Sequence, residues 1–526
     1  MFLQFNNIKK KIFNNKLAIF CIIYTLVTIV IYTLPYGSTT TILSISIFSF
    51  FISLVFMFGV FASPIYLLFS IIASSEFIFN YFFNERISIG IISSTIESNS
   101  NESLNIISAN HEYIPYYIFN TIVYSIPAFI IKRNFKIGII LFMPIILVIN
   151  SLYERINKIP SNYKNETYFF KSNVATPVHK AYPFFIGDAI YIASMIIEDK
   201  AVYVKKDHDF PSEKVSNEIK EIDDDIVVFI MGETSLSERY SLYGYNVKTT
   251  PFLDSLKEKE ISSCFFKNVH SSANLTRYSV PMSFSFDVPE RQDYIFKEMN
   301  IIEMANHAGF DTYWITAQSN SDGLNTKINF IASYANKMIS TDNLPNNKKI
   351  KMDIDLIPYF REAINQDGKK FIVLHMNGSH QKYSNKYDDI DKNALPNASD
   401  YDKSIHHTDR VISNVFEYLE MSGKKYSVLF TSDHGEVVGR GHGYVNDGGK
   451  QLFVPLVYFS NSSDKCTKIE SLRGENGWIS GLSNKFIVLD MMGYDLNDSF
   501  IKKEINNDRI FRSNAEVANF LDELKS

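Results

Sequence analysis

Charged residues are distributed very unevenly along this chain of 526 residues. The first 153 residues contain 13 charged side chains, about 8%, whereas the remainder contains 96, about 26%. Residues 17–34 and 41–75 contain no charged side chain at all. A helix needs about 20 consecutive apolar residues to cross the hydrocarbon core of a bilayer. The first part of the chain is therefore predicted to lie in a membrane, and the second part to be folded in water.

Hydrophobic segments of this length recur along the first part and predict five transmembrane helices. Their approximate ranges are residues 17–34, 41–60, 62–84, 114–131 and 137–153. Gly59 and Pro64 mark the break between the second and third helices. Buried helices of a protein core are one alternative, but they would need polar faces and caps that these segments lack. A cleaved signal peptide fits no better, because hydrophobic segments return after the first.

The orientation of these helices follows from lysine and arginine in short loops, which favour the cytoplasmic side. One basic cluster precedes the first helix and a second lies between the fourth and fifth. They consist of Lys9, Lys10, Lys11 and Lys16, and of Lys132, Arg133 and Lys136. With both clusters cytoplasmic, five crossings place everything after Tyr153 outside the cytoplasm. Residues 154–224 then form a polar connector, in which residues 182–197 predict either a helix along the membrane surface or an ordinary packed helix.

Composition excludes two classes of function. The net charge is −5, so the chain lacks the basic excess of a nucleic-acid-binding protein. The three cysteines form no Cys-x-x-Cys pattern, which argues against a cysteine-based metal site. Cys21 lies in a predicted span. Cys264 and Cys466 either form one disulfide in an oxidising compartment or remain reduced.

Residues 225–526 alternate short apolar runs with polar helical stretches, the pattern of an α/β domain with a mostly parallel sheet. The clearest strands are predicted at residues 226–231, 312–316, 371–376, 427–431 and 453–459. In open α/β sheets, ligands bind outside the carboxyl ends of the strands. The polar segments that follow three of these strands are therefore expected to converge on one site. They are residues 232–234, 377–380 and 432–436.

These segments contain the ligand types of a catalytic zinc site. Glu233, Asp433 and His434 offer two carboxylates and an imidazole, which leave a further position open on the metal. Zinc bound in this way lowers the pKa of a hydroxyl and stabilises charge on a transferring phosphoryl group. Residues 269–281 offer several hydroxyls at the predicted start of a helix, where backbone amides favour an anion.

Taken in order, these motifs resemble the phosphoethanolamine transferases of Gram-negative envelopes. The matching segments are Gly-Glu-Thr at 232–234, Ser-Leu-Tyr-Gly-Tyr at 241–245, Thr-Thr-Pro at 249–251, Thr276 five residues before Pro281, Gly-Ser-His at 378–380 and Ser-Asp-His-Gly-Glu at 432–436. The resemblance implies an α/β sandwich of the alkaline phosphatase and sulfatase type, tethered by five membrane helices. It also implies a multi-pass protein of the inner membrane with its catalytic domain, residues 225–526, in the periplasm.

The resemblance assigns roles to particular residues. Thr276 takes the position of the nucleophilic threonine that is also a zinc ligand, and Glu233, Asp433 and His434 complete the metal site. His380 and His442 match the two histidines that contact the transferred group or a second metal. The implied cofactor is one tightly bound zinc ion, with a second during turnover left open. The implied donor is phosphatidylethanolamine from the membrane, and the acceptor is lipopolysaccharide or another envelope glycan.

A donor-lipid loop is also implied by the resemblance. It spans residues 94–102, where Ser94, Ser98 and Glu102 fall at the polar contact positions.

Two departures from the family pattern bear on the acceptor. Members that modify lipid A bracket the nucleophile with a disulfide, where this chain has Ser272 and Met282. They also carry a lysine where this chain has Leu324. The resemblance is therefore closer to members that modify core sugars of lipopolysaccharide than to those that modify lipid A.

Several alternatives stay open. Thr234 and Ser235 are competing nucleophiles beside Glu233. A sulfatase-like hydrolase would need a Cys or Ser followed by x-Pro-x-Arg, which the segment around Thr276 lacks. A phosphoglycerol transferase of the same fold and a membrane-anchored binding protein with a degenerate site are the remaining classes. His442 is alternatively a surface turn residue, His375 is expected to be a buried core histidine, and His406 and His407 to lie on a solvated helical face.

Overall fold

The computed structural model describes residues 2–97, 108, 110–157, 175–181, 187–194, 203–318, 326–340, 344, 350–446, 448–505 and 508–525. The chain forms two compact units. The first contains residues 1–93 and 110–199, and the second contains residues 94–109 and 200–526. The predicted connector, residues 154–224, is thus divided between the two units.

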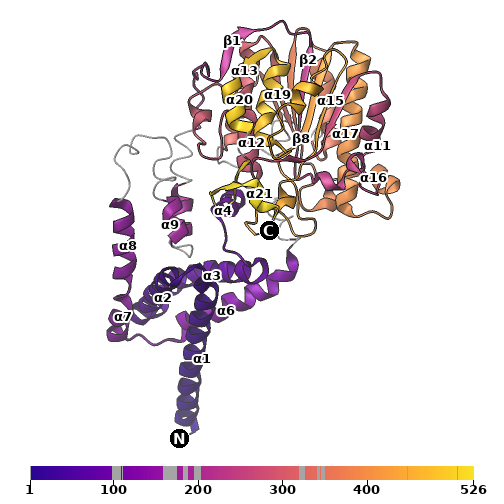
Figure 1. Cartoon of the computed structure of the whole chain (residues 1–526). Coiled ribbons are helices and arrows are strands. Elements are labelled where there is room, and N and C mark those ends of the chain that lie inside the picture. Colours follow the sequence, from indigo (N-terminus) through magenta and orange to yellow (C-terminus); the bar gives the residue numbers. More distant parts are fainter. Residues whose placement is uncertain are drawn as a thin grey trace. The chain divides into compact units, whose positions relative to one another are not determined.

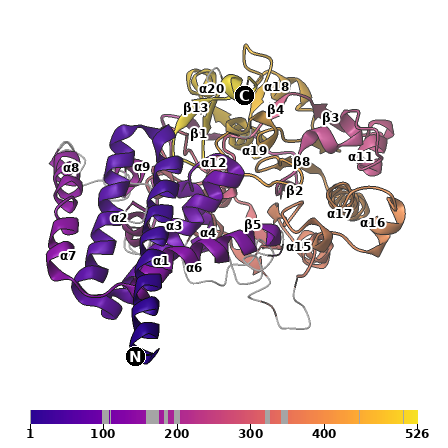
Figure 2. The ribbon, with the colours of Figure 1, turned by 90° about the horizontal axis from the view of Figure 1, so that it is seen from below.

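The first unit is built from apolar helices, which Figure 2 shows running beside one another. They are α1 (Phe2–Thr33), α2 (Ser38–Phe58), α3 (Ser63–Phe83), α6 (Ile114–Ile130), α7 (Phe135–Phe142) and α8 (Ile145–Asn157). A short 3-10 turn, Gly59–Ala62, separates α2 from α3, where the sequence predicted a break. Pro144 lies between α7 and α8 and divides the segment predicted as the fifth helix, because proline donates no backbone hydrogen bond.

Three helical stretches of the described residues are long and apolar enough to cross a membrane. They are Asn15–Tyr36, Ser38–Phe83 and Phe135–Glu154, and the second, with 46 residues, is long enough for two crossings. Helices overlap all five predicted ranges. The helix at the fourth range, α6, has 17 residues, which is fewer than the roughly 20 that cross the hydrocarbon core. Five crossings therefore remain a prediction.

Large apolar side chains cover the outside of α1. Such a surface is unfavourable in water and suits contact with lipid, which argues against a buried core helix. Its members are between 48% and 61% exposed: Ile19, Phe20, Ile23, Val27 and Ile31.

The second unit contains a seven-stranded sheet in the order β3-β9-β8-β2-β7-β5-β6. From one edge to the other, these strands are Ser262–Phe266, Leu456–Ser460, Tyr426–Ser432, Ile226–Gly232, Lys370–His375, Asp311–Thr316 and Lys337–Ser340. β8, β2, β7, β5 and β6 are parallel, whereas β9 runs antiparallel to both of its neighbours. All five predicted strands are present, and the sequence missed the two edge strands, β3 and β6.

Helices cover both faces of this sheet, as Figure 1 shows. Alternate residues of β2 point to opposite faces. Ile226, Val228 and Ile230 join the core formed with α11 (Pro251–Ser255), α15 (Ile357–Ile364) and α17 (Asp400–Ser422). On the other face, Phe229 stacks on Phe284, with ring centroids 4.8 Å apart. Helices α12 (Thr276–Phe284), α13 (Ile301–His307) and α19 (Asn484–Met491) form this second layer. The result is a three-layer α/β/α sandwich.

Shorter elements complete the second unit. The paired strands are β1 (Val215–Ile219) with β11 (Tyr494–Leu496), β4 (Val269–His270) with β10 (Ile479–Ser480), and β12 (Arg509–Phe511) with β13 (Val517–Asn519). The helices are α14 (Lys327–Ala332), α16 (Asp389–Ala394), α18 (Cys466–Glu470), α20 (Asp498–Ile505) and α21 (Phe520–Glu523). Two further helices are α4 (Ile89–Glu97), between α3 and α6 in the sequence, and α9 (Thr176–Ala181), between α8 and β1.

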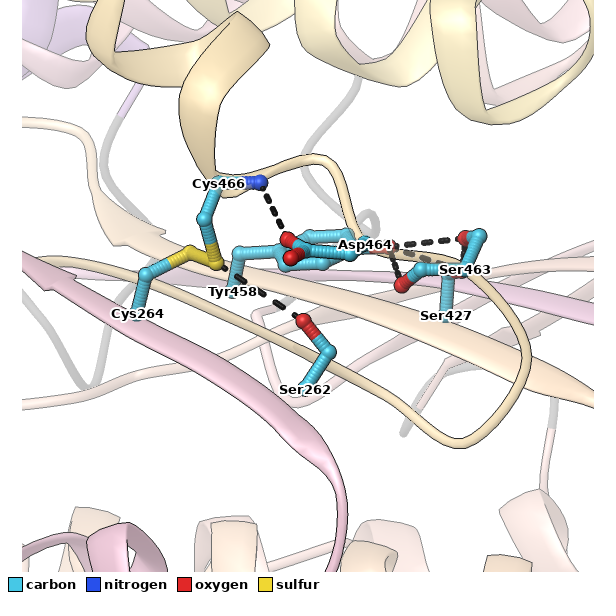
Figure 3. Close-up of a disulfide and its surroundings, with 7 residues drawn as sticks. All are labelled: Ser262, Cys264, Ser427, Tyr458, Ser463, Asp464 and Cys466. Carbon is cyan, nitrogen blue, oxygen red and sulfur yellow. Dashed lines mark hydrogen bonds between the residues drawn. A yellow bond between two sulfur atoms is a disulfide. The ribbon is translucent and has the colours of Figure 1, made fainter.

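A disulfide joins Cys264 on the edge strand β3 to Cys466 at the start of α18 (Figure 3). The two Cα atoms are 5.8 Å apart, a separation that a disulfide spans without backbone movement. The Cys466 backbone N–H also donates to Asp464, at 2.9 Å. Of the two states that the sequence left open for this pair, the structure has the disulfide. Bonds of this kind persist in oxidising compartments.

We expect Cys264→Ser, Cys466→Ser and the double variant to lower the free energy of unfolding by about 2–5 kcal/mol, because the bond closes a long loop in the unfolded chain. The measurement is the melting temperature of the second unit with and without a reducing agent. The reductant should lower the melting temperature of the wild type and leave that of the variants unchanged. Equal melting temperatures for wild type and variants would show that the bond contributes nothing.

Candidate metal centre and active site

The register of the sheet places two carboxylates side by side. β2 and β8 are neighbours, and Gly232 pairs with Ser432 at their carboxyl ends. The next residues along the two strands are Glu233 and Asp433, and both are buried. The structure therefore confirms the convergence that the strand ends predicted.

Thr276 completes a tight group with Glu233 and His434. Its hydroxyl donates to Glu233 Oε1 at 3.0 Å and lies 3.1 Å from His434 Nε2. His434 Nε2 is also 3.4 Å from Glu233 Oε1 and 3.3 Å from Asp433 Oδ2. Thr276 is the first residue of α12, so the predicted start of a helix lies at this position. Two carboxylates, an imidazole and a hydroxyl thus face one point.

The chemistry of these groups fits a zinc ion. Asp433 Oδ1 accepts the backbone N–H groups of Thr234 and His434, at 3.0 and 2.7 Å. Asp433 Oδ2 is buried and has no hydrogen-bond partner among the described residues. A buried carboxylate oxygen of this kind is costly unless a cation binds it. Glu233, Asp433 and His434 have ligand atoms within 4.8 Å of one another.

Each histidine of the site has one ring nitrogen occupied. The Nδ1 atoms of His434 and His380 lie 2.8 and 2.9 Å from the carbonyl oxygens of Gly435 and Gln381, to which they donate. His442 Nδ1 lies 2.9 Å from Glu436 Oε2. A partner on Nδ1 fixes the tautomer, so Nε2 is the nitrogen that would bind a metal or move a proton.

His380 and His442 form a second group of candidate ligands with Glu233. Their rings lie 5.4 Å apart, and the His442 ring is 4.2 Å from that of His434. Both side chains are half-buried, unlike the completely buried His434. His442 is thus part of the cluster and is not a surface turn residue. The side of the site that carries His380 and His442 is the more open one.

Electrostatics also favour a cation here. Burial raises the pKa of Asp433 well above its usual range, and the neighbouring Glu233 carboxylate raises it further. Burial would also raise the pKa of Glu233, but the surrounding histidines, His434 first, hold it at about 2. Two carboxylates in one buried site cannot both ionise unless a positive charge is added. Burial, together with His434 and His380, lowers the pKa of His442 well below its usual range, which favours the neutral, metal-binding imidazole.

The backbone around Glu233 is held in an unusual conformation. Thr234 has φ +56°, a left-handed value that is rare for a β-branched residue. Its N–H donates to Asp433 and its carbonyl accepts the Tyr401 hydroxyl, at 2.8 Å. Gly378 packs directly against this segment and has φ +47°. A Cβ atom at that position would lie 2.3 Å from the Glu233 carbonyl oxygen, so only glycine fits.

The competing nucleophiles are less open than Thr276. Thr234 and Ser235 are completely buried, whereas Thr276 is half-buried. The Thr234 hydroxyl donates to Glu233 Oε1 at 2.7 Å, and the Ser235 hydroxyl shares a hydrogen bond with Tyr240 at 2.6 Å.

The predicted donor-lipid loop is described only in part. Ser94 lies in α4 and is half-buried, whereas Ser98 and Glu102 lie outside the described residues. Leu324, one of the two departures from the family pattern, also lies outside them. Ser272 and Met282, which stand where the lipid A-directed members have two cysteines, are both buried. The assignment of residues 94–102 to the donor lipid stays a prediction.

The expectation for His406 and His407 is wrong. Both are buried, and their Nδ1 atoms lie 2.7 Å from the two oxygens of Asp391. Arg410 also pairs with Asp391, at 3.2 Å, so a positive charge already balances this carboxylate. Asp391 of α16 packs against these two histidines of α17, a contact that a pattern of polar residues alone does not reveal. His375 is buried in β7, as expected for a core histidine.

Sequence reasoning assigned no role to three residues that contact the site: Gln318, Tyr383 and Glu436. Gln318 donates to Glu233 Oε2 at 2.9 Å, and the Tyr383 hydroxyl donates to Glu436 Oε1 at 2.7 Å. Glu436 in turn holds His442. The signal for Gln318 was present, because it follows a predicted strand by two residues, at the same edge of the sheet as Glu233.

The fold and site define an alkaline phosphatase-like α/β/α domain, in which carboxylates, histidines and a hydroxyl meet at the carboxyl ends of parallel strands. Residues 225–482 match the sulfatase family. The matched range covers the central sheet and the residues of the site described above.

Curated relatives match about two fifths of the chain. YhbX of Escherichia coli (strain K12), whose name specifies a transferase and no substrate, is 35% identical over 216 residues, which cover 40% of this chain and 38% of YhbX. The phosphoethanolamine transferase EptC of the same organism is 25% identical over 228 residues, 40% of each chain. The matches thus span about two fifths of these relatives' length.

Two solved structures share the fold. The lipooligosaccharide phosphoethanolamine transferase A (EptA) of Neisseria meningitidis, an integral membrane protein, superimposes with a TM-score of 0.62, 19% identity and 91% coverage of both chains. The C-terminal periplasmic domain of Escherichia coli EptC, in a complex with zinc, gives a TM-score of 0.51 and 20% identity, covering 58% of this chain and 95% of that domain. An apolar helical region joined to a sulfatase-like domain is therefore a fold shared with EptA.

We expect Gly378→Ala to lower the affinity of the second unit for zinc by at least tenfold, because the added methyl group must displace the Glu233 backbone. The measurement is competition with a chromogenic chelator. Gly309→Ala is the matched control, since Gly309 also has a left-handed φ, +84°, and nothing lies within 4 Å of its added Cβ atom. Unchanged affinity in Gly378→Ala would show that this close approach does not position Glu233.

Proposed function

We propose that this protein transfers phosphoethanolamine from phosphatidylethanolamine to a hydroxyl of a lipopolysaccharide core sugar or a similar periplasmic glycan. The observation that carries the proposal is the position of the Thr276 hydroxyl, 3.0 Å from Glu233 and 3.1 Å from His434 at the start of α12. The names of EptC and EptA, and the shared fold, supply the transferred group. The disulfide between Cys264 and Cys466 supports an oxidising compartment such as the periplasm.

Glu233, Asp433, His434 and Thr276 would hold one zinc ion. When bound, the ion would lower the pKa of the Thr276 hydroxyl and stabilise negative charge on the transferring phosphoryl group. The zinc complex of the EptC domain supports this choice of metal. Glu233, His380 and His442 are the candidate ligands for a second ion during turnover.

The chain's own residues would carry out two displacements. In the first, Thr276 Oγ attacks the phosphorus of phosphatidylethanolamine, a P–O bond forms to the threonine, and the bond to the diacylglycerol oxygen breaks. In the second, the acceptor hydroxyl attacks the phosphothreonine and Thr276 leaves. His380 and His442 lie on the more open side of the site. In the first displacement they would take the proton of the Thr276 hydroxyl and pass it to the departing diacylglycerol oxygen. In the second they would take the proton of the acceptor hydroxyl and return it to Thr276.

We expect Thr276→Ala to reduce transfer by roughly three orders of magnitude or more, since it removes the nucleophile. Wild-type protein incubated with phosphatidylethanolamine should carry a phosphoethanolamine adduct on the peptide that contains Thr276, as detected by mass spectrometry. Ser279→Ala is the matched control, because Ser279 lies on the same helix and its hydroxyl donates only to the Leu275 carbonyl, at 3.1 Å. An adduct on Thr234 or Ser235 would contradict the assignment, and hydrolysis without an adduct would favour a sulfatase-like hydrolase.

The acceptor is inferred from the two departures from the family pattern. Only the second displacement needs contacts with the acceptor, so specificity is decided around the metal group rather than within it. A leucine at position 324, where lipid A-directed members have a lysine, removes a cation that would attract an anionic group. This supports an uncharged sugar hydroxyl as the acceptor over a lipid A phosphate.

We expect cells that express this protein to carry phosphoethanolamine on the lipopolysaccharide core or a similar periplasmic glycan. Lipid A phosphates should stay unmodified, and polymyxin susceptibility should change little. Mass spectrometry of lipid A and of released core oligosaccharide, with the Thr276→Ala variant as the control, tests this directly. Modified lipid A together with increased polymyxin resistance would show that the two departures do not determine the acceptor.

A further inference from the structure

Gln318 contacts the candidate metal ligand Glu233 from a strand that contributes no ligand of its own. It follows β5 and lies two strands away from β2 in the sheet. Its Nε2 atom donates to Glu233 Oε2 at 2.9 Å and to the Met376 carbonyl oxygen at 3.0 Å. Because both partners only accept hydrogen bonds, the nitrogen of the amide must face them. Both N–H groups of Gln318 are therefore used.

The two oxygens of Glu233 have different surroundings. Oε1 accepts the hydroxyls of Thr234 and Thr276 and faces His434 at 3.4 Å. Oε2 accepts the amide of Gln318. Oε1 is thus the oxygen that lies among the candidate ligands, whereas Oε2 is turned toward β5. A side chain that holds Oε2 in place determines where Oε1 points.

Gln318 is itself held in a fixed position. Its backbone N–H donates to the Thr316 hydroxyl at 3.0 Å, and this hydroxyl lies 3.2 Å from His375 Nδ1. The Met376 carbonyl that accepts from Gln318 belongs to the residue directly after β7, whose N–H donates to Met231 on β2. The amide therefore connects the carboxyl ends of three adjacent strands, β5, β7 and β2, at the level of Glu233.

We propose that Gln318 is a positioning residue for the metal site. It holds Glu233 with a single oxygen, Oε1, directed at the zinc position shared with Thr276, Asp433 and His434. Hydrogen bonds to the second oxygen of a ligating carboxylate orient it, and loss of such partners typically costs about 10–100-fold in metal affinity or activity. The inference rests on the proposed zinc site and adds the residue that fixes its geometry.

The experiment measures zinc affinity of the full chain in detergent by competition with a chromogenic chelator, with no turnover assay needed. Gln318→Met keeps the length of the side chain and removes both donors, and we expect it to bind zinc 10–100-fold more weakly. Gln318→Leu should behave in the same way. Asn306→Leu is the matched control. Asn306 donates to the Tyr334 carbonyl at 2.9 Å and accepts from Thr312 on β5, but contacts no candidate ligand.

A double-mutant cycle separates positioning from a general structural effect. If Gln318 acts through Glu233, then adding Gln318→Met to a Glu233→Gln variant should change zinc affinity by less than twofold. The melting temperature of the metal-free Gln318→Met protein should stay close to that of Asn306→Leu. Full zinc affinity in Gln318→Met, or an equal additional loss in the Glu233→Gln background, would overturn the inference. A wild type that binds no zinc would instead contradict the proposed function.

Discussion

The enforced closeness of two buried carboxylates is the constraint on which the rest of the site depends. Because Gly232 pairs with Ser432 in adjacent parallel strands, the next residues, Glu233 and Asp433, lie side by side. Burial raises the pKa of Asp433 well above its usual range, which is the cost of this arrangement in the absence of a positive charge. The site is therefore organised for a cation, and the tautomers of three histidines are fixed by partners on their Nδ1 atoms.

Helix α17 supports this arrangement through hydrogen bonds to the segments that follow β2 and β7. Tyr401 and Ser404 lie three residues apart and hence on one face of the helix. The Tyr401 hydroxyl donates to the Thr234 carbonyl and accepts the Leu236 N–H, both at 2.8 Å. Ser404 donates to the Ser379 hydroxyl at 2.8 Å. One helix thus holds both the segment after Glu233 and the segment before His380, so the unusual φ angles there are maintained by hydrogen bonds outside the metal group.

The sequence predicted most of the fold because the central strands are continuous apolar runs, buried on both faces. The edge strands β3 and β6 were missed because they are only partly buried, so their apolar pattern is weak. The register of β2 against β8 is a tertiary property, yet the motifs at the strand ends contain residues that the structure brings together. His406 and His407 were misplaced because their partner, Asp391, lies on a separate helix. Gln318 was overlooked although it follows a predicted strand, because a neutral amide indicates no particular chemistry until its acceptor is known.

The choice among the three candidate hydroxyls follows from burial and backbone environment. Thr234 and Ser235 lie in the segment whose conformation fixes Glu233, and both of their hydroxyls are completely buried and already bonded to neighbours. A phosphoryl group could reach them only by disrupting that segment. Thr276 is half-buried at the first position of a nine-residue helix, where the positive end of the helix dipole favours an anion. The residue that would accept the phosphoryl group is thus on a different element from those that fix the metal ligands, so its hydroxyl can be modified and released while Glu233, Asp433 and His434 stay in place.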